Sequence, residues 1–187
     1  MNPDMPRLST PVGRRDHTRG SLGASVTLVE YGDYQCPYCA AAYPVIERVS
    51  KRFGAQLCFA YRHFPLSHMH PRAEPAAEAA EVAGEQDMFW PIHDSLFRHQ
   101  EALEDEDLLA RAEALGLDVS RFAMALATGL FAPRVREDFM SGIRSGVNGT
   151  PTLFVNSVRY DGPRDADSLT AALQYAAQRA SRTVTRS

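Results

Sequence analysis

The sequence has little of several features that mark specialised classes of protein. Its 187 residues include only three cysteines, Cys36, Cys39 and Cys58, too few for a framework of structural disulfides. Basic and acidic side chains number 20 and 23, so no basic excess suggests nucleic acid or an anionic membrane as a partner. No apolar run approaches the roughly 20 residues of a membrane span, so we expect no membrane insertion.

The first residues contain no apolar segment of the kind found in secretory signal peptides. As written, the sequence is therefore expected to be cytoplasmic, and it would be periplasmic or extracytoplasmic if a leader has been removed. Hydrophobic residues make up 44% and charged residues 23% of the chain, which is ordinary for a globular protein. The length is enough to bury a core without disulfides.

Changes in hydrophobic pattern divide the chain into a lead-in, a core domain and an insertion. Residues 1–23 are rich in proline, glycine and arginine and are predicted to form an extended lead-in. Residues 24–70 and 147–182 contain the strand-like runs and are expected to share one mixed sheet flanked by helices. Residues 71–146 are alanine-rich with helical periodicity, which predicts an inserted helical subdomain. The fold class is therefore predicted to be α/β.

Turn residues and hydrophobic periodicity predict where each element lies. The predicted strands are at 26–31, 56–64, 152–155 and 158–160, with a short edge segment near Val12. The predicted helices are at 37–52, 72–84, 89–100, 105–115, 118–129 and 167–179, with one more that opens at Pro133.

Two cysteines follow the first predicted strand at a tight spacing, as Cys36-Pro37-Tyr38-Cys39. They lie at the start of the first predicted helix. A thiol there is beside unpaired backbone N–H groups and the positive end of the helix dipole, and both favour the thiolate. Cys36 is therefore predicted to be the reactive sulfur and Cys39 its resolving partner.

A Cys-x-x-Cys pair can also be half of a zinc site, which usually has a second Cys/His pair. None of the further candidates forms a second pair at the usual spacing. These candidates are Cys58, His63, His68 and His70. We therefore favour a redox pair and predict no metal, with a non-redox metal-binding module as an open alternative.

A second motif, Gly149-Thr150-Pro151-Thr152, opens the strand after the predicted insertion. Proline cannot donate to a strand ladder, so Pro151 is expected to have a special role. Spacing alone favours an ordinary trans bond. A cis bond would instead bend the chain and could present the backbone of Thr150 toward the thiol.

Taken together, these motifs resemble the thioredoxin superfamily, and the helical insertion resembles its DsbA-like branch of bacterial thiol–disulfide oxidoreductases. The resemblance covers about residues 25–180. It rests on the stretches 29–39, 61–66, 89–94 and 146–156. It implies a thioredoxin-like fold with an all-helical insertion subdomain. It also implies a protein disulfide oxidoreductase that acts on protein or peptide thiols and disulfides, needs no cofactor and has an unidentified redox partner.

The resemblance also implies a role for each motif residue. Cys36 would be the nucleophile and Cys39 would resolve the mixed disulfide. Glu30, six residues before Cys36, matches the family's buried acid, which accepts a proton from the resolving thiol. A carboxyl group desolvated under a sheet edge suits proton exchange near neutral pH.

The family's substrate groove supplies the other expected residues. Pro151 is implied to be cis, and Thr150 would offer backbone hydrogen bonds to an extended peptide. Pro37 and Tyr38 complete the expected substrate contacts. Strong oxidants of this family have His where Tyr38 stands, so we predict a milder oxidant. The direction of exchange stays open, as does the alternative of a glutathione-dependent isomerase or transferase on the same fold.

Overall fold

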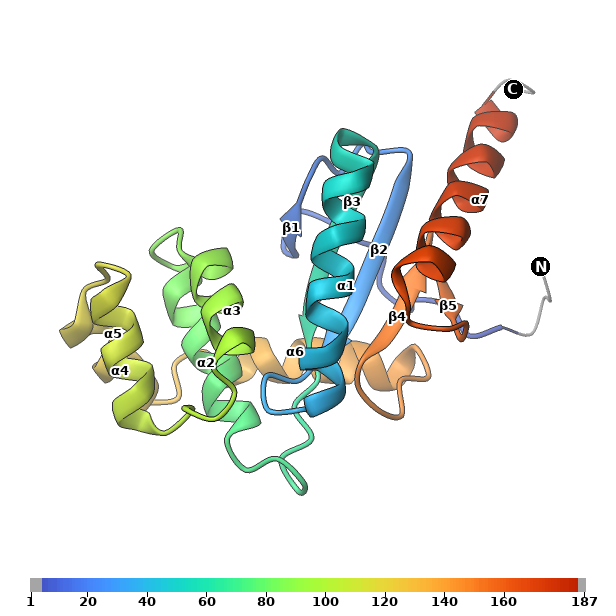
Figure 1. Cartoon of the computed structure of the whole chain (residues 1–187). Helices are drawn as coiled ribbons and strands as arrows, with labels where there is room; N and C mark the ends of the chain where they lie inside the picture. Colours follow the sequence, from blue (N-terminus) through green and yellow to red (C-terminus); the bar gives the residue numbers. More distant parts are fainter. Residues whose placement is uncertain (1–4, 185–187) are drawn as a thin grey trace. The chain divides into compact units, whose positions relative to one another are not determined.

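The computed structural model describes residues 5–184, so residues 1–4 of the predicted lead-in lie outside the described residues (Figure 1). Its mixed sheet has the strand order β1-β3-β2-β4-β5. The pairs β1·β3, β2·β4 and β4·β5 are antiparallel. The strands are β1 His17–Arg19, β2 Val26–Gly32, β3 Leu57–His63, β4 Thr152–Val155 and β5 Val158–Tyr160. The helices are α1 Pro37–Phe53, α2 Ala73–Gly84, α3 Phe89–Arg98, α4 Asp105–Ala114, α5 Val119–Ala127, α6 Ala132–Arg144 and α7 Ala166–Val184, with a 3-10 turn at Gly54–Gln56.

The chain forms two compact units. Unit 1 comprises the residues up to Tyr31, residues 41–62 and the residues from Ser141 onward. Unit 2 comprises Gly32–Ala40 and His63–Met140. The cysteine pair therefore groups with the helices of the predicted insertion. The domain boundaries expected from sequence follow a different division and stay a prediction.

Unit 1 contains the sheet, except for the last residue of β2 and of β3. Strand β3 is buried along its whole length, as expected for a strand covered on both faces. Helix α7 contacts β4 and buries Leu169 and Leu173, four residues apart on one helix face. The β4–β5 hairpin turns at Asn156 and Ser157, both at positive φ, as in a tight two-residue turn.

The lead-in pairs with both edges of this sheet. The edge strand that the lead-in forms is β1, at His17–Arg19. The prediction of an edge segment near Val12 was therefore wrong in position. Strand β1 pairs with β3, with Thr18 opposite Ala60. Further upstream, Arg7 forms an isolated antiparallel bridge with Val158 of β5. Gly20 follows β1 at φ +93°, where a Cβ would lie 2.2 Å from the carbonyl oxygen of Leu57, so only glycine fits.

A buried arginine holds the lead-in in place. Arg62 donates to both carboxylate oxygens of Asp16, at 2.7 and 3.1 Å. It also donates to the carbonyl oxygens of Thr10 and Pro11 and to the Tyr31 hydroxyl. The hydrogen bonds between Arg62 and Asp16, together with their opposite charges, fix the lead-in, which has no strong hydrophobic periodicity of its own.

Unit 2 is the helical unit. Helix α2 packs against α3 and α5, and its alanines allow close approach because they add little bulk. The side chain of Asp118 accepts from the backbone N–H of Arg121, so Asp118 is the N-cap of α5. The predicted helices 72–84, 89–100, 105–115 and 118–129 are confirmed to within about two residues at each end.

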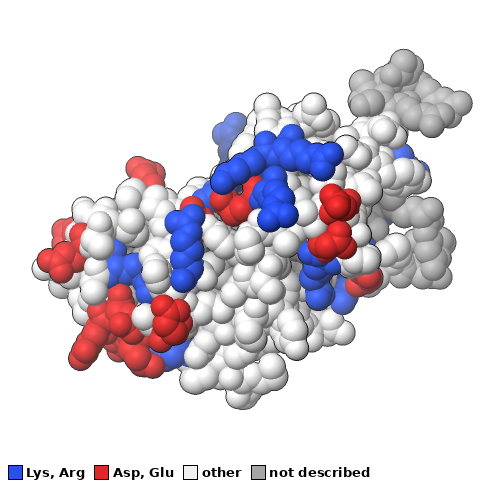
Figure 2. Space-filling view, in the orientation of Figure 1, with Lys and Arg blue, Asp and Glu red and all other residues white. Residues whose placement is uncertain are grey.

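Charged side chains are unevenly spread. Figure 2 shows acidic side chains gathered over α4, whose first turn contains Asp105, Glu106 and Asp107. Basic side chains gather over the end of α1, where Lys51 and Arg52 lie. No helix within residues 5–184 is long and apolar enough to cross a membrane.

Candidate active site

The dithiol lies in unit 2, at the junction between β2 and α1. Strand β2 ends at Gly32 and α1 begins at Pro37, so residues 33–36 form the turn between them. Cys36 and Cys39 are buried, at 3% and 0% exposed. Tyr38 between them is 71% exposed. The backbone N–H of Cys39 donates to the carbonyl oxygen of Cys36 at 3.0 Å, which places both cysteines in one helical turn.

The carboxylate of Asp33 organises this turn. Its Oδ1 accepts from the backbone N–H groups of Gln35, at 2.8 Å, and Cys36, at 3.1 Å. Its Oδ2 accepts from the N–H of Leu66 at 2.9 Å, and contacts His70 Nδ1 at 2.8 Å. The side chain of Asp33 is fully buried and that of His70 is 14% exposed. One carboxylate thus joins the cysteine turn to the loop after β3.

The next residue of the turn is fixed by an aromatic cluster. The Tyr34 hydroxyl hydrogen-bonds to His93 Nδ1 at 2.9 Å. Its ring lies 4.9 Å from the ring of Phe97, centroid to centroid. His93 is 1% exposed and is satisfied by this contact, so it is a core histidine.

The remaining groups of the turn are also bonded within unit 2. Gln35 accepts the backbone N–H of Arg72 at 2.7 Å. Gln100 donates to the carbonyl oxygens of Tyr34, at 2.6 Å, and Cys36, at 3.1 Å. Each of residues 33–36 is therefore held by hydrogen bonds to the helical unit, and the dithiol is presented on a preformed backbone.

Three predicted site residues lie in unit 1. The Thr150–Pro151 bond is cis, as the resemblance implied. The hydroxyl of Thr152 donates to the carbonyl oxygen of Gly149 at 2.6 Å and closes the turn before β4. Glu30 is 2% exposed and pairs with Leu153 across β2 and β4. The structure thus groups Cys36, Pro37, Tyr38 and Cys39 in unit 2, and Glu30, Thr150 and Pro151 in unit 1. That these two groups work as one site stays a prediction.

Cys58 lies in unit 1 and is fully buried in β3. Burial, with the Asp16 charge adding to it, raises the pKa of its thiol. A buried thiol with a raised pKa is a weak nucleophile, so Cys58 is best described as a small core residue.

A second buried polar cluster lies in unit 2. His63 Nε2 is 2.9 Å from Glu81 Oε1, and the His63 backbone N–H donates to Asp138 at 3.1 Å. One potential ligand atom from each of these residues lies within 4.8 Å of the others. Arg134 contacts Asp138 and lies 3.9 Å from Glu81, so a protein cation already balances the carboxylates. This arrangement fits a structural ion cluster better than a metal centre.

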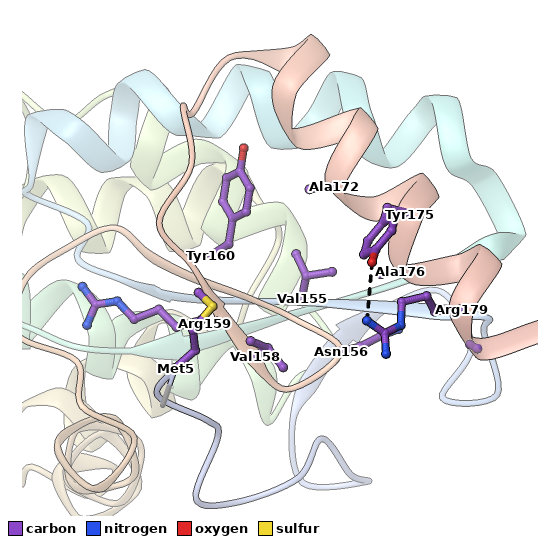
Figure 3. Close-up of a pocket in the computed structure, with 11 residues that line it drawn as sticks. Met5, Val155, Asn156, Val158, Arg159, Tyr160, Ala172, Tyr175, Ala176 and Arg179 are labelled. Carbon is purple, nitrogen blue, oxygen red and sulfur yellow. Dashed lines mark hydrogen bonds between the residues drawn. The ribbon is translucent and has the colours of Figure 1, made fainter. Parts of the chain in front are cut away.

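Unit 1 has a mainly apolar hollow of about 300 Å³ between the β4–β5 hairpin and α7 (Figure 3). Met5, Val155 and Tyr160 line it, and Tyr175 accepts a hydrogen bond from Arg179 at its rim. None of the predicted site residues is among the described residues that line it.

Sequence reasoning missed the pairing of Asp33 with His70. An acidic residue three positions before Cys36 was a usable signal, because such residues cap helix starts. No sequence signal identified His70 as the partner of Asp33, because the two residues are 37 positions apart.

Comparison with solved structures shows the fold. The oxidised form of BdbD from Bacillus subtilis superposes with a TM-score of 0.80 at 22% identity, over 94% of this chain and 100% of that chain. The alpha-DsbA1 of Wolbachia pipientis gives a TM-score of 0.79 at 19% identity, over 95% and 98%. These similarities confirm the predicted thioredoxin-like fold.

Closer sequence matches come from longer proteins. The Na(+)/H(+) antiporter NhaA 1 of Salinispora arenicola is 46% identical over 159 residues, which is 85% of this chain and 24% of that protein. The NhaA antiporter of Herminiimonas arsenicoxydans is 44% identical over 168 residues, or 90% and 26%. The chain thus spans about a quarter of the length of the curated relatives it matches.

A family model described as thioredoxin matches residues 13–175 of the chain. It includes the cysteine turn, the helices of unit 2 and the cis-proline strand. The chain therefore belongs to the thioredoxin family.

Proposed function

We propose that the chain is a thiol–disulfide oxidoreductase that exchanges disulfides with protein or peptide substrates. The observation that carries this proposal is the cysteine pair at the start of α1, on a turn whose four residues are each hydrogen-bonded within unit 2. Fixing that backbone holds both sulfurs in one geometry through both steps of an exchange.

In the reducing direction, the Cys36 thiolate attacks one sulfur of a substrate disulfide. A mixed disulfide forms, and the other substrate sulfur leaves as a thiolate that takes a proton. Cys39 then loses its proton and attacks the Cys36 sulfur, which releases the second substrate thiol. Two electrons and two protons pass to the substrate, and Cys36 and Cys39 end as a disulfide. The oxidising direction is the same sequence reversed, and the proposal covers both.

The expected substrate contacts come from both units. In unit 2, the exposed Tyr38 offers an apolar and hydrogen-bonding surface next to the thiols. In unit 1, Thr150 and Pro151 would bind an extended peptide through its backbone. Glu30, buried in β2, would take the proton of Cys39 during the resolving step.

Substitution of each cysteine tests this mechanism. Cys36→Ser should abolish the acceleration of insulin reduction by dithiothreitol, because the attacking thiol is lost. Cys39→Ser should accumulate mixed disulfides, visible on non-reducing gels, because the resolving step is lost. Cys58→Ser is the matched control and should keep full activity. Retained activity in Cys36→Ser would overturn the proposal, and one tightly held zinc per purified chain would favour the metal-binding module.

The curated relatives favour a second candidate function. They are named as Na(+)/H(+) antiporters and match this chain at up to 46% identity over only a quarter of their length. The chain would then serve as a redox domain that acts on, or is attached to, a membrane transporter. The Cys39→Ser trap tests this in cells: an antiporter identified by mass spectrometry in the mixed disulfide would support it, and its absence among captured proteins would count against it.

A further inference from the structure

The carboxylate of Asp33 lies beside Cys36 and is buried. Its Oδ1 takes the Cys36 backbone N–H, at 3.1 Å, so this donor is committed to Asp33. A fixed negative charge at this position opposes the formation of a second one on the Cys36 sulfur. Taken alone, Asp33 would therefore make Cys36 a poorer thiolate.

His70 offsets that effect. Its Nδ1 is 2.8 Å from Asp33 Oδ2, which is the geometry of a charge-assisted hydrogen bond. In the described part of the chain, it is the one basic side chain that contacts Asp33. The neighbouring charged groups are engaged elsewhere: Arg72 with Glu104 and Asp105, and Glu74 with Ser67.

The same pair also has a positional effect. Because Oδ2 takes the N–H of Leu66 as well as His70, the loop after β3 is bonded to the turn that precedes α1. His70 therefore keeps Asp33 in place, and Asp33 keeps the Cys36 backbone in place. His70 acts on the sulfur through Asp33, as a positioning residue.

We propose that Asp33 and His70 form a charge pair that sets the reduction potential of the Cys36–Cys39 couple. The inference rests on the proposed function. A dithiol becomes more oxidising when its reduced form is stabilised, and the Cys36 thiolate is part of that form. Removal of the Asp33 charge should then make the couple more oxidising, and removal of His70, which shares a hydrogen bond with that carboxylate, should make it more reducing.

The two partners therefore predict shifts of opposite sign, which a merely structural role would not produce. We expect the equilibrium constant with glutathione to change about tenfold toward the reduced form in Asp33→Asn, a rise of about 30 mV in potential. In His70→Gln the equilibrium constant should change about tenfold toward the disulfide. In the double variant it should be close to the wild-type value. His70→Lys, which places a positive charge beside Asp33, should lie closer to the wild type than His70→Gln does.

Ser67→Ala is the matched control, because Ser67 lies on the same loop and bonds only to the exposed Glu74 among described residues. It should leave the potential unchanged. The inference would be overturned if Asp33→Asn and His70→Gln shifted the equilibrium constant in the same direction, or if both changed it less than threefold. Should Asp33→Asn fail to fold, the comparison of His70→Gln with His70→Lys decides, and equal potentials in those two would overturn it. A wild-type chain that never equilibrates with glutathione would refute the proposed function instead.

Discussion

Two consecutive residues of β3 show how differently the two units are held. Arg62 belongs to unit 1 and His63 to unit 2, and they are 2% and 1% exposed. Neighbours along a strand point to opposite faces of a sheet. Arg62 contacts the lead-in and Tyr31, whereas His63 contacts Glu81 and Asp138.

The difference lies in the chemistry of the two basic side chains. Burial lowers the pKa of Arg62, but the hydrogen bonds and electrostatic attraction of Asp16 and Tyr31 together outweigh burial and raise that pKa above its ordinary value. Arg62 therefore keeps its charge. His63 contacts Glu81 in a cluster with Arg134 and Asp138, and burial raises the pKa of Asp138. Unit 1 thus has an anchor insensitive to pH, and unit 2 has a sensitive one.

The largest expected effect is the loss of the unit 1 anchor. Arg62→Met should lower the free energy of unfolding by about 3–5 kcal/mol, because it leaves the Asp16 carboxylate, which is only 9% exposed, without its charged partner. Urea denaturation measures the change. Adding Asp16→Asn should recover part of the loss, since the uncompensated charge is removed. A loss below about 1 kcal/mol would mean that solvent reaches the pair and that Arg62 is no anchor.

A matched pair of tyrosines sharpens the comparison. Tyr31 bonds to Ser141 and to the charged Arg62, whereas Tyr34 bonds to His93. Tyr31→Phe should cost about 1.5–3 kcal/mol and Tyr34→Phe about 1 kcal/mol, because hydrogen bonds to charged groups are the stronger ones. Urea denaturation of both variants at pH 7 gives the ranking. The reverse order would show that unit 2 depends more on its polar contacts than unit 1 does.

The pH dependence of unit 2 tests the comparison directly. Burial raises the pKa of Asp138 above its ordinary 3.8, against the lowering effects of His63 and Arg134. The folded state thus holds this proton more tightly than the unfolded chain. The stability that this proton contributes is fully present below the pKa that Asp138 has in the unfolded chain. It is lost as the pH rises through the pKa that Asp138 has in the folded protein.

We therefore expect the stability of the wild type relative to Asp138→Asn to fall as pH rises from about 4, by about 1.4 kcal/mol for each unit of the shift. Urea denaturation of both proteins at intervals between pH 4 and 7 measures it. A difference that is constant or grows with pH would contradict the raised pKa.

The smallest expected effect compares a buried charge near Cys36 with an exposed one. Tyr38 is 71% exposed, so the charge of His in Tyr38→His would be screened by solvent. The potential should rise, as expected if Tyr38 makes this a milder oxidant, but by less than about 30 mV. Equilibration with glutathione measures it. A larger rise than in Asp33→Asn would show that the exposed position dominates.

Local signals predicted much of the fold. The strands at 152–155 and 158–160 were predicted to the residue, because the turn at Asn156 and Ser157 and the alternating pattern are encoded within nine residues. The prediction of a strand near Val12 was wrong because β1 is only three residues long and polar. Its position depends on Arg62, far along the sequence, which no local pattern reveals.

The site divides in the same way. The cysteine pair and its place at a helix start could be predicted from spacing, and the cis bond before Pro151 from resemblance. The residues that bond to the turn at 33–36 could not be predicted from the sequence. His70, His93 and Gln100 reach residues 33–36 from helices and loops at least 34 positions away, so their contacts exist only after unit 2 has folded.

The lead-in has a consequence for self-association. Its bridge at Arg7 lies against the outer strand β5, and its strand β1 pairs with β3 and forms the outer strand on the other side of the sheet. Outer strands with open backbone groups are templates on which other chains add and aggregate. Proteolytic loss of residues 7–19 would uncover β3 and β5 at once and leave two strands open to pairing with other chains.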